Sequence, residues 1–435
     1  MRKFWLDCFI TTIFTFAVLG GIYAITQLRL FNAFDPVGQA LGDMEMTDIT
    51  FSQIREDPPL DTNIVIVNIG NLSRGEIGQQ IMTLSRCKPK LIALDIIFSC
   101  DGGMKDSINC PQAYDTLSNM LFAMAVQGAG TMVLAEKLWQ SKRLQNTNTD
   151  VYDSIEHTDL ELRGNSHEGF VNLDTDAETQ EDLKVCRKFV PSKVVNGKVE
   201  LAFSAKIAML YDSVTTKQFL ARNKDTEVIN FRGNIVDWHG ASSFAGRYPV
   251  LDWDQALDSN QFVPAMIKDK IVIMGFLGAD LRDTSWDDKF ITPLNKNYAG
   301  KTRPDMYGVV VHANAVSMIL NKDYINELTT WQLYAIAFLV CFFNVALFSL
   351  INTRIPLWFD GLSLLAQLVE IILFSVMMIW FFYWYELKLN LTITLAIVAL
   401  GGTCFELYQN VLKRVFVRVA TSRWFTKKRK EVLTP

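Results

Sequence analysis

Residues 63–70 read NIVIVNIG, residues 90–98 read KLIALDIIF, and residues 130–138 read GTMVLAEKL. Each is a short apolar run, rich in Val, Ile or Leu, that is typical of a strand buried on both faces. Between them, residues 76–86 (EIGQQIMTLSR) and 113–127 (AYDTLSNMLFAMAVQ) carry apolar residues at helical spacing. The order strand, helix, strand, helix, strand predicts an α/β domain with a mostly parallel sheet flanked by helices.

The alternation continues further along the chain. Residues 197–211 (GKVELAFSAKIAMLY) predict a strand edge followed by a helix, and residues 226–233 (TEVINFRG) and 269–278 (DKIVIMGFLG) predict further strands. In residues 308–320 (GVVVHANAVSMIL), the β-branched run predicts a strand that stops at His312, with a helix starting there. A polar interval, residues 141–166, predicts an inserted segment.

The remaining apolar sequence lies near the two ends of the chain. From Cys8, the stretch CFITTIFTFAVLGGIYAITQLRLF has no charge before Arg29 and no small-residue cleavage site, which indicates an uncleaved anchor. Three further apolar stretches begin at Trp331, Gly361 and Leu389. Each is long enough to cross a bilayer as a helix of roughly 20 residues. The sequence therefore predicts four transmembrane helices.

Basic residues predict the orientation. The start MRK, the loop with Arg354 and the tail from Val411, with eight Lys/Arg against one Glu, would lie in the cytoplasm by the positive-inside rule. The large middle domain would then lie outside. The predicted organisation is a basic start (1–8), a first span (9–28), an outer domain (29–330), three spans (331–351, 361–385 and 389–411) and a basic cytoplasmic tail (412–435).

The charge distribution bears on partners. The chain carries a net charge of −4 although its tail is strongly basic, so the outer domain is acidic. An acidic outer domain argues against nucleic-acid binding there. The basic tail suits contact with anionic membrane lipid, and its simpler role is to fix the topology.

Four cysteines fall in the exported part: Cys87, Cys100, Cys110 and Cys186. Disulfides persist outside the cytoplasm. Cys100 and Cys110 could close the loop SCDGGMKDSINCP, but four cysteines allow three pairings and the sequence does not choose between them. No cysteine or histidine spacing of a zinc site is present, so we expect no metal and no cofactor.

Seven motifs in order give the outer domain a family resemblance: IVIVNIGNLS, KLIALDIIF, GFVNLDTDAETQEDLKVCRKFVP, INFRG, DKIVIMG, DKFITPL and YGVVVHANAVSMIL. From about Asn63 to Leu320 the chain resembles the second type of CHASE domain, an extracellular sensory module of bacterial cyclases and histidine kinases. The resemblance implies a periplasmic sensor in a bacterial inner membrane.

Two departures from that family pattern stand out. Members usually carry a cyclase, phosphodiesterase or kinase after the last span, whereas roughly 25 residues follow here, so we expect the output to come from a separate membrane or cytoplasmic protein. Where the family commonly has an acidic pair after the first strand, this chain has Gly70 and Asn71. If the family's ligand site needs those carboxylates, this chain binds its ligand differently.

The candidate ligand pocket is predicted at the carboxyl ends of the strands, where open α/β sheets bind ligands. Its expected rim is Asp95, Gly275, Gly278, Asp288 and His312. Asp95 ends an apolar strand and could instead cap a turn. His312 lacks a nearby nucleophile or second histidine, so a structural role comes first, with pocket lining or pH sensing second.

In the third span, Glu370 and Gln367 lie one turn apart, far from either end. A carboxylate at that depth is costly and marks a functional candidate. It could join helices of the same chain or contact a membrane partner.

Two function classes follow. The first is a sensory or docking protein whose outer domain binds a ligand or partner and signals through the transmembrane helices. The alternative is a structural subunit of a larger envelope complex, with the outer domain as an interaction platform. No nucleophile, base and orienting group can be assembled from the motifs, so we expect no enzymatic activity.

Overall fold

The computed structural model describes residues 2–26, 45–100, 110–145, 151–175, 185–236, 240–296 and 303–414. The chain forms two compact units, one of residues 43–325 and one that joins residues 1–42 to residues 326–435. The first unit is the predicted α/β domain and the second holds the predicted apolar helices. Most of the predicted basic tail lies beyond Arg414, outside the described residues.

A mostly parallel sheet forms the centre of the α/β unit. Its strands, in spatial order, are β11 (Val250–Leu251), β1 (Ile64–Asn68), β12 (Ile271–Gly275), β2 (Leu91–Leu94), β3 (Met132–Trp139) and β4 (Ser154–Glu156), with β5 (His167–Phe170) also paired to β3. Only the β3–β4 pairing is antiparallel among these strands. The predicted mostly parallel sheet is therefore confirmed.

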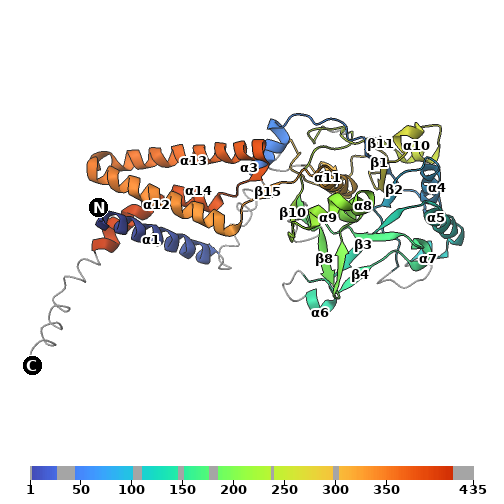
Figure 1. Ribbon diagram of the computed structural model, residues 1–435, viewed down its shortest axis with the longest axis horizontal. Coiled ribbons are helices and arrows are strands. Elements are labelled where there is room, and N and C mark those ends of the chain that lie inside the picture. Colours follow the sequence, from blue (N-terminus) through green and yellow to red (C-terminus); the bar gives the residue numbers. More distant parts are fainter. Residues whose placement is uncertain are drawn as a thin grey trace, which may run out of the picture. The chain divides into compact units, whose positions relative to one another are not determined.

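Helices cover both faces of this sheet (Figure 1). On one face lie α4 (Arg74–Ser85), α5 (Thr116–Gly128) and α10 (Trp253–Leu257), and on the other lie α8 (Phe203–Tyr211) and α11 (Gly308–Asn321). Side chains alternate between the faces of a strand. Val65, Val67 and Met274 accordingly pack with Ile81 and Phe122 in one buried cluster on the α4 side.

Helix α11 corrects one prediction. Residues 308–311 were expected to form a strand ending at His312, yet the helix begins at Gly308 and contains His312. All but the last two residues of α11 are buried. A β-branched residue in a helix costs below about 0.7 kcal/mol, whereas burying a Val side chain gains about 1.5 kcal/mol or more. Burial therefore outweighs local propensity here.

The interval of residues 141–166 is an ordered insertion in its described part, because it contributes β4 and two short helices. Smaller elements complete the unit: α3 (Met46–Ile49), α6 (Lys142–Gln145), α7 (Leu160–Arg163), α9 (Ser213–Leu220), β6 (Asp174–Thr175), β7 (Cys186–Phe189), β8 (Ser192–Val195), β9 (Lys198–Leu201), β10 (Glu227–Val228), β13 (Lys289–Phe290) and β14 (Met306–Tyr307). They form the sheets β10–β7–β6, β13–β14 and β8–β9.

The second unit contains four long apolar helices: α1 (Arg2–Thr26), α12 (Thr330–Arg354), α13 (Phe359–Tyr385) and α14 (Thr392–Leu407), the last extended by one π-helical turn (Tyr408–Leu412). Each is long and apolar enough to cross a membrane, which confirms the four predicted helices. The strands β15 (Asn326–Glu327) and β16 (Leu387–Lys388) pair beside the helix ends. Lys413 forms an ion pair of 2.5 Å with Asp7 and so links the end of α14 to α1.

The α11–β12 contact yields a first prediction. A Cβ added at Gly275 would lie 2.8 Å from the Cβ of Val309, a separation that requires α11 or β12 to shift. We expect Gly275→Ala to lower the free energy of unfolding by about 1–3 kcal/mol through overpacking. Thermal unfolding of the purified full chain measures this effect. Gly128→Ala is the matched control, because no atom lies within 4 Å of the added methyl group; equal melting temperatures for the two variants would contradict the prediction.

Candidate functional site

A cavity of about 510 Å³ opens at the carboxyl ends of the parallel strands. Its walls come from the segment after β2, the second half of β3, the segment after β5, and the start of α11. The volume falls within the range of small-molecule sites, roughly 300–1,000 Å³, and the position is the usual one for ligands of α/β sheets. Three of the five predicted rim residues line it: Asp95, Asp288 and His312.

Asp95 follows the last residue of β2, and its backbone N–H donates to the carbonyl of Met274 on β12. This hydrogen bond continues the β2–β12 pairing by one residue and fixes the position of the Asp95 side chain at the cavity. The carboxyl group is half-buried and receives no hydrogen bond or ion pair within the described part of the chain. Burial, and then the charge of Asp288, raise the pKa of Asp95 to about 8. Near neutral pH the group is largely protonated and can donate a hydrogen bond.

Asp288 approaches the cavity from the segment before β13. Its carboxylate oxygen Oδ2 lies 3.3 Å from where a Cβ of Gly308 would stand, so the glycine gives the acid room beside the first turn of α11. The backbone N–H of Gly308 also donates to the Asp288 carbonyl at 3.0 Å. A negative group is favoured at a helix N-terminus. Asp95 and Asp288 thus present two carboxyl groups to one cavity from different elements.

His312 lies in the second turn of α11 and is 4% exposed. Its ring packs edge-on against Phe203 of α8, with 5.4 Å between the ring centroids. Burial lowers the pKa of His312 to about 4, so the ring is neutral at physiological pH. The residue holds α11 against α8 and also lines the cavity, which combines the two roles that the sequence left open.

The two predicted glycines lie in different places. Gly275 ends β12 beside the cavity, where its missing side chain leaves room for Val309 and for Asp95. Gly278, at φ +92°, packs under Asp283 and Tyr307 instead. Those two residues line a separate, smaller cavity of about 60 Å³. Gly278 therefore does not line the large cavity in the described structure.

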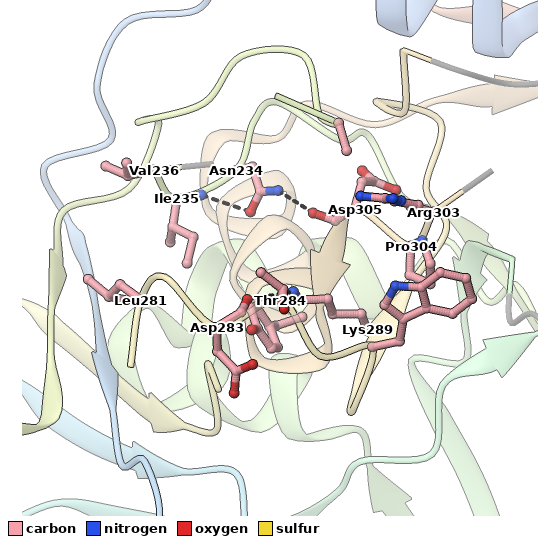
Figure 2. A pocket seen from close by; sticks show the side chains of 13 residues that line it. Asn234, Ile235, Val236, Leu281, Asp283, Thr284, Lys289, Arg303, Pro304 and Asp305 are labelled. Atoms are coloured by element: carbon pink, nitrogen blue, oxygen red, sulfur yellow. Dashed lines mark hydrogen bonds between the residues drawn. The ribbon is translucent and has the colours of Figure 1, made fainter. Parts of the chain in front are cut away.

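The smaller cavity is held together by its own hydrogen bonds. Figure 2 shows Asn234 between Ile235 and Asp305: its amide donates to the Asp305 carbonyl at 2.7 Å, and its oxygen accepts from the Ile235 N–H at 2.8 Å. The Asp305 carboxylate accepts two bonds from Thr292, at 2.7 and 2.8 Å. These groups satisfy one another, and the volume is far below that of a ligand site. We assign this cavity a structural role.

The sequence analysis did not identify several residues that line the large cavity. Lys137 lies on β3, Tyr152 precedes β4, and Asn172 follows β5. The Asn172 side chain both donates to the carbonyl and accepts from the N–H of Leu138, so it ties the end of β5 to β3. A polar residue directly after an apolar run was the available signal for Asn172. No sequence pattern marked Lys137 and Tyr152 as cavity residues. They lie beside the cavity because of the spatial order of the strands, which the sequence does not reveal.

Four further candidate residues do not line the cavity: Cys100, Cys110, Gln367 and Glu370. Cys100 and Cys110 are joined by a disulfide, whereas Cys87 and Cys186 form no disulfide among the described residues. Gln367 donates to the carbonyl of Val398 on α14 at 2.9 Å.

Glu370 is bonded within its own chain. Its Oε2 accepts a hydrogen bond of 2.5 Å from Asn344 on α12. Gln367 and Glu370 therefore connect α13 to both neighbouring helices, and the partner contact expected for them stays a prediction.

Comparison with known protein families matches the family model described as the CHASE2 domain to residues 16–351. The matched region contains the whole α/β unit and all the residues of the large cavity. No curated protein and no solved structure matches the chain.

Asp95 yields a prediction of pH dependence. Its folded pKa lies above the unfolded value near 3.8, so this group's contribution to stability is greatest below about pH 4 and declines as the pH rises towards 8. Asp95→Asn should remove that decline and stabilise the protein at pH 8 by about 1–2 kcal/mol, less than the full shift implies because part of the side chain reaches solvent. Unfolding measured between pH 5 and 9 tests this. A wild-type and variant difference that is constant with pH would contradict it.

The Asn344–Glu370 bond gives a separate prediction. Glu370→Leu leaves the Asn344 amide without its acceptor inside the helix unit and should cost about 0.5–2 kcal/mol. Glu370→Gln keeps an acceptor and serves as the matched control, with stability close to wild type. Loss of helicity during titration with sodium dodecyl sulfate measures both variants. If the Leu variant resists unfolding as well as the Gln variant, the bond contributes nothing.

Proposed function

The chain belongs to the CHASE2 domain family, a sensory domain of cyclases and kinases, and from that premise we propose that the 510 Å³ cavity is its ligand site. The observation that carries the proposal is the convergence of Asp95, Asp288 and His312 on one cavity at the carboxyl ends of the strands. The match to a sensory domain family supports a role in sensing and signalling. The identity of the site is our inference.

The chemistry of the cavity favours a small polar ligand. Asp95 presents a carboxyl group to which no described residue donates a hydrogen bond, and Asp288 places a second carboxyl group nearby. Lys137 and Asn172 add one cationic and one amide group. Such a set offers both donors and acceptors, and so recognises a molecule that both donates and accepts hydrogen bonds, such as a polyol or an amino acid. We propose ligand binding there, without a reaction.

The route for a signal begins at α11, which lines the cavity at its first turns. Asp323, two residues after α11 ends, forms a bidentate ion pair with Arg232, with hydrogen bonds of 2.6 and 2.7 Å. Residues 322–329 then connect α11 to α12, the first C-terminal membrane helix. A ligand that shifts α11 would therefore act on a short, anchored connection. Signalling requires two such states with different ligand affinity.

We further propose that the domain faces the outside of a bacterial inner membrane and passes its state to a separate membrane or cytoplasmic protein. The orientation in this proposal rests on the distribution of Lys and Arg around the four apolar helices. The bilayer lipids would surround those helices.

Thermal unfolding of the full chain in lipid nanodiscs, with a collection of polyols, sugars, amino acids and amines, tests the ligand site. We expect at least one compound to raise the melting temperature, since a ligand stabilises the state that binds it. Asp95→Ala and Asp288→Ala should each weaken its binding at least tenfold. Asp225→Ala, at an exposed acid outside the cavity, should leave the binding unchanged.

Two outcomes would overturn the proposal. One is that no compound shifts the melting temperature. The other is a shift that the two cavity variants preserve. A stoichiometric membrane partner in a gentle detergent purification, with no ligand effect, would favour the alternative of a structural envelope subunit.

A further inference from the structure

A second cluster of chemical groups lies on three adjacent strands of the same sheet. Glu136 is on β3, His157 directly follows β4, and Glu168 is on β5. His157 Nδ1 lies 3.2 Å from Glu136 Oε2 and 3.2 Å from Glu168 Oε1. All three ligand atoms lie within 4.8 Å of one another. This cluster takes no part in the proposed function.

Strand register places the three side chains together. In the parallel β3–β5 pair, Leu134 stands opposite Glu168, and Leu134 and Glu136 share one face because they are two residues apart. In the antiparallel β3–β4 pair, Lys137 stands opposite Glu156, so His157 comes next, beside Glu136. The neighbours Ala135 and Lys137 face the ligand cavity, so Glu136 projects from the other side of β3.

Glu136 has an unusual environment for a carboxylate. Only 3% of its side chain is exposed, and its Oε1 has no hydrogen-bond partner in the described part of the chain. His157 Nδ1 and Glu168 Oε1 also lack hydrogen-bond partners there, in spite of the short separations. A buried carboxylate without donors is costly unless a cation compensates it.

The charged groups around Glu136 do not supply the cation that its buried carboxylate requires. Arg163 binds the other oxygen of Glu168, Oε2, at 2.6 Å and so turns Oε1 towards the cluster. The carboxylates of Glu168 and Glu200 add negative charge near Glu136, and the cations Lys206 and Arg163 oppose it. Two acids and one histidine thus surround a point that attracts positive charge.

The distances suit a zinc-type ion. Zinc binds histidine nitrogen and carboxylate oxygen at roughly 2.0–2.2 Å, so neighbouring ligand atoms of a tetrahedral site stand about 3.4 Å apart. Both separations from His157 Nδ1 are close to that value. The His157 side chain is 39% exposed, so the cluster lies near the protein surface. A zinc ion with three protein ligands commonly takes water as its fourth ligand.

We propose that Glu136, His157 and Glu168 form a binding site for a divalent transition-metal ion of the zinc type. Arg163 acts as a positioning residue, because it orients the Glu168 carboxylate without touching the ion. The ion would join β3, β4 and β5, and so fix the inserted segment to the sheet.

Zinc counting on the full chain tests the proposal. The detergent-purified protein, carrying an affinity tag without histidine, is stripped with a chelator, dialysed against micromolar zinc chloride and analysed by mass spectrometry of the metal. We expect about one zinc per chain. Glu136→Gln and His157→Asn should each lower the affinity at least tenfold. His167→Asn is the matched control, because His167 is an exposed histidine on β5 next to Glu168 in sequence.

A second measurement guards against variants that fail to fold. Cobalt(II) added to the stripped wild type should give the visible absorption of a four-coordinate ion, and zinc should displace it. Absence of bound zinc in the wild type would overturn the proposal. Equal zinc in His157→Asn and His167→Asn would also overturn it, because the metal would then be bound elsewhere.

Discussion

The contact between α11 and β12 is the constraint on which the α/β unit depends. At Gly275 the last residue of the strand meets Val309 so closely that no side chain fits. This approach allows α11 to bury nearly all its surface against the sheet. It also sets the first turns of the helix, with Gly308 and His312, beside Asp95. A cavity with two carboxyl groups and a neutral imidazole follows from that one packing arrangement.

Much of this arrangement could be predicted from sequence, because apolar runs identify buried strands and the carboxyl ends of parallel strands gather polar groups. Asp95 is predicted in that way. Asp288 and His312 also line the cavity, but Asp288 precedes a short strand of another sheet and His312 lies within α11. Lateral strand order could not be predicted: β12 lies between β1 and β2, although it comes much later in the chain. The start of α11 was wrong for another reason, since burial outweighed the β-branched residues.

The cluster of Glu136, His157 and Glu168 shows the same limit more strongly. A glutamate inside the apolar run GTMVLAEKL was a visible anomaly in the sequence. Its partners became apparent only from the pairing of β3 with both β4 and β5. In the apolar helices, by contrast, the isolated Glu370 correctly marked a polar contact, and the structure supplied Asn344 as its donor. A single unusual residue can be recognised in the sequence, whereas a cluster of residues from different strands can be recognised only in the folded structure.

The outermost strands of the central sheet are short: β11 has two residues, β4 has three and β5 has four. An open sheet edge normally invites the backbone of another molecule to add a further strand. Edges this brief offer few unpaired amide and carbonyl groups, so the domain resists association of that kind. Copies that gather at high density on a membrane surface would therefore contact one another through helix faces or loops. Their central sheets would not join into one sheet across two molecules.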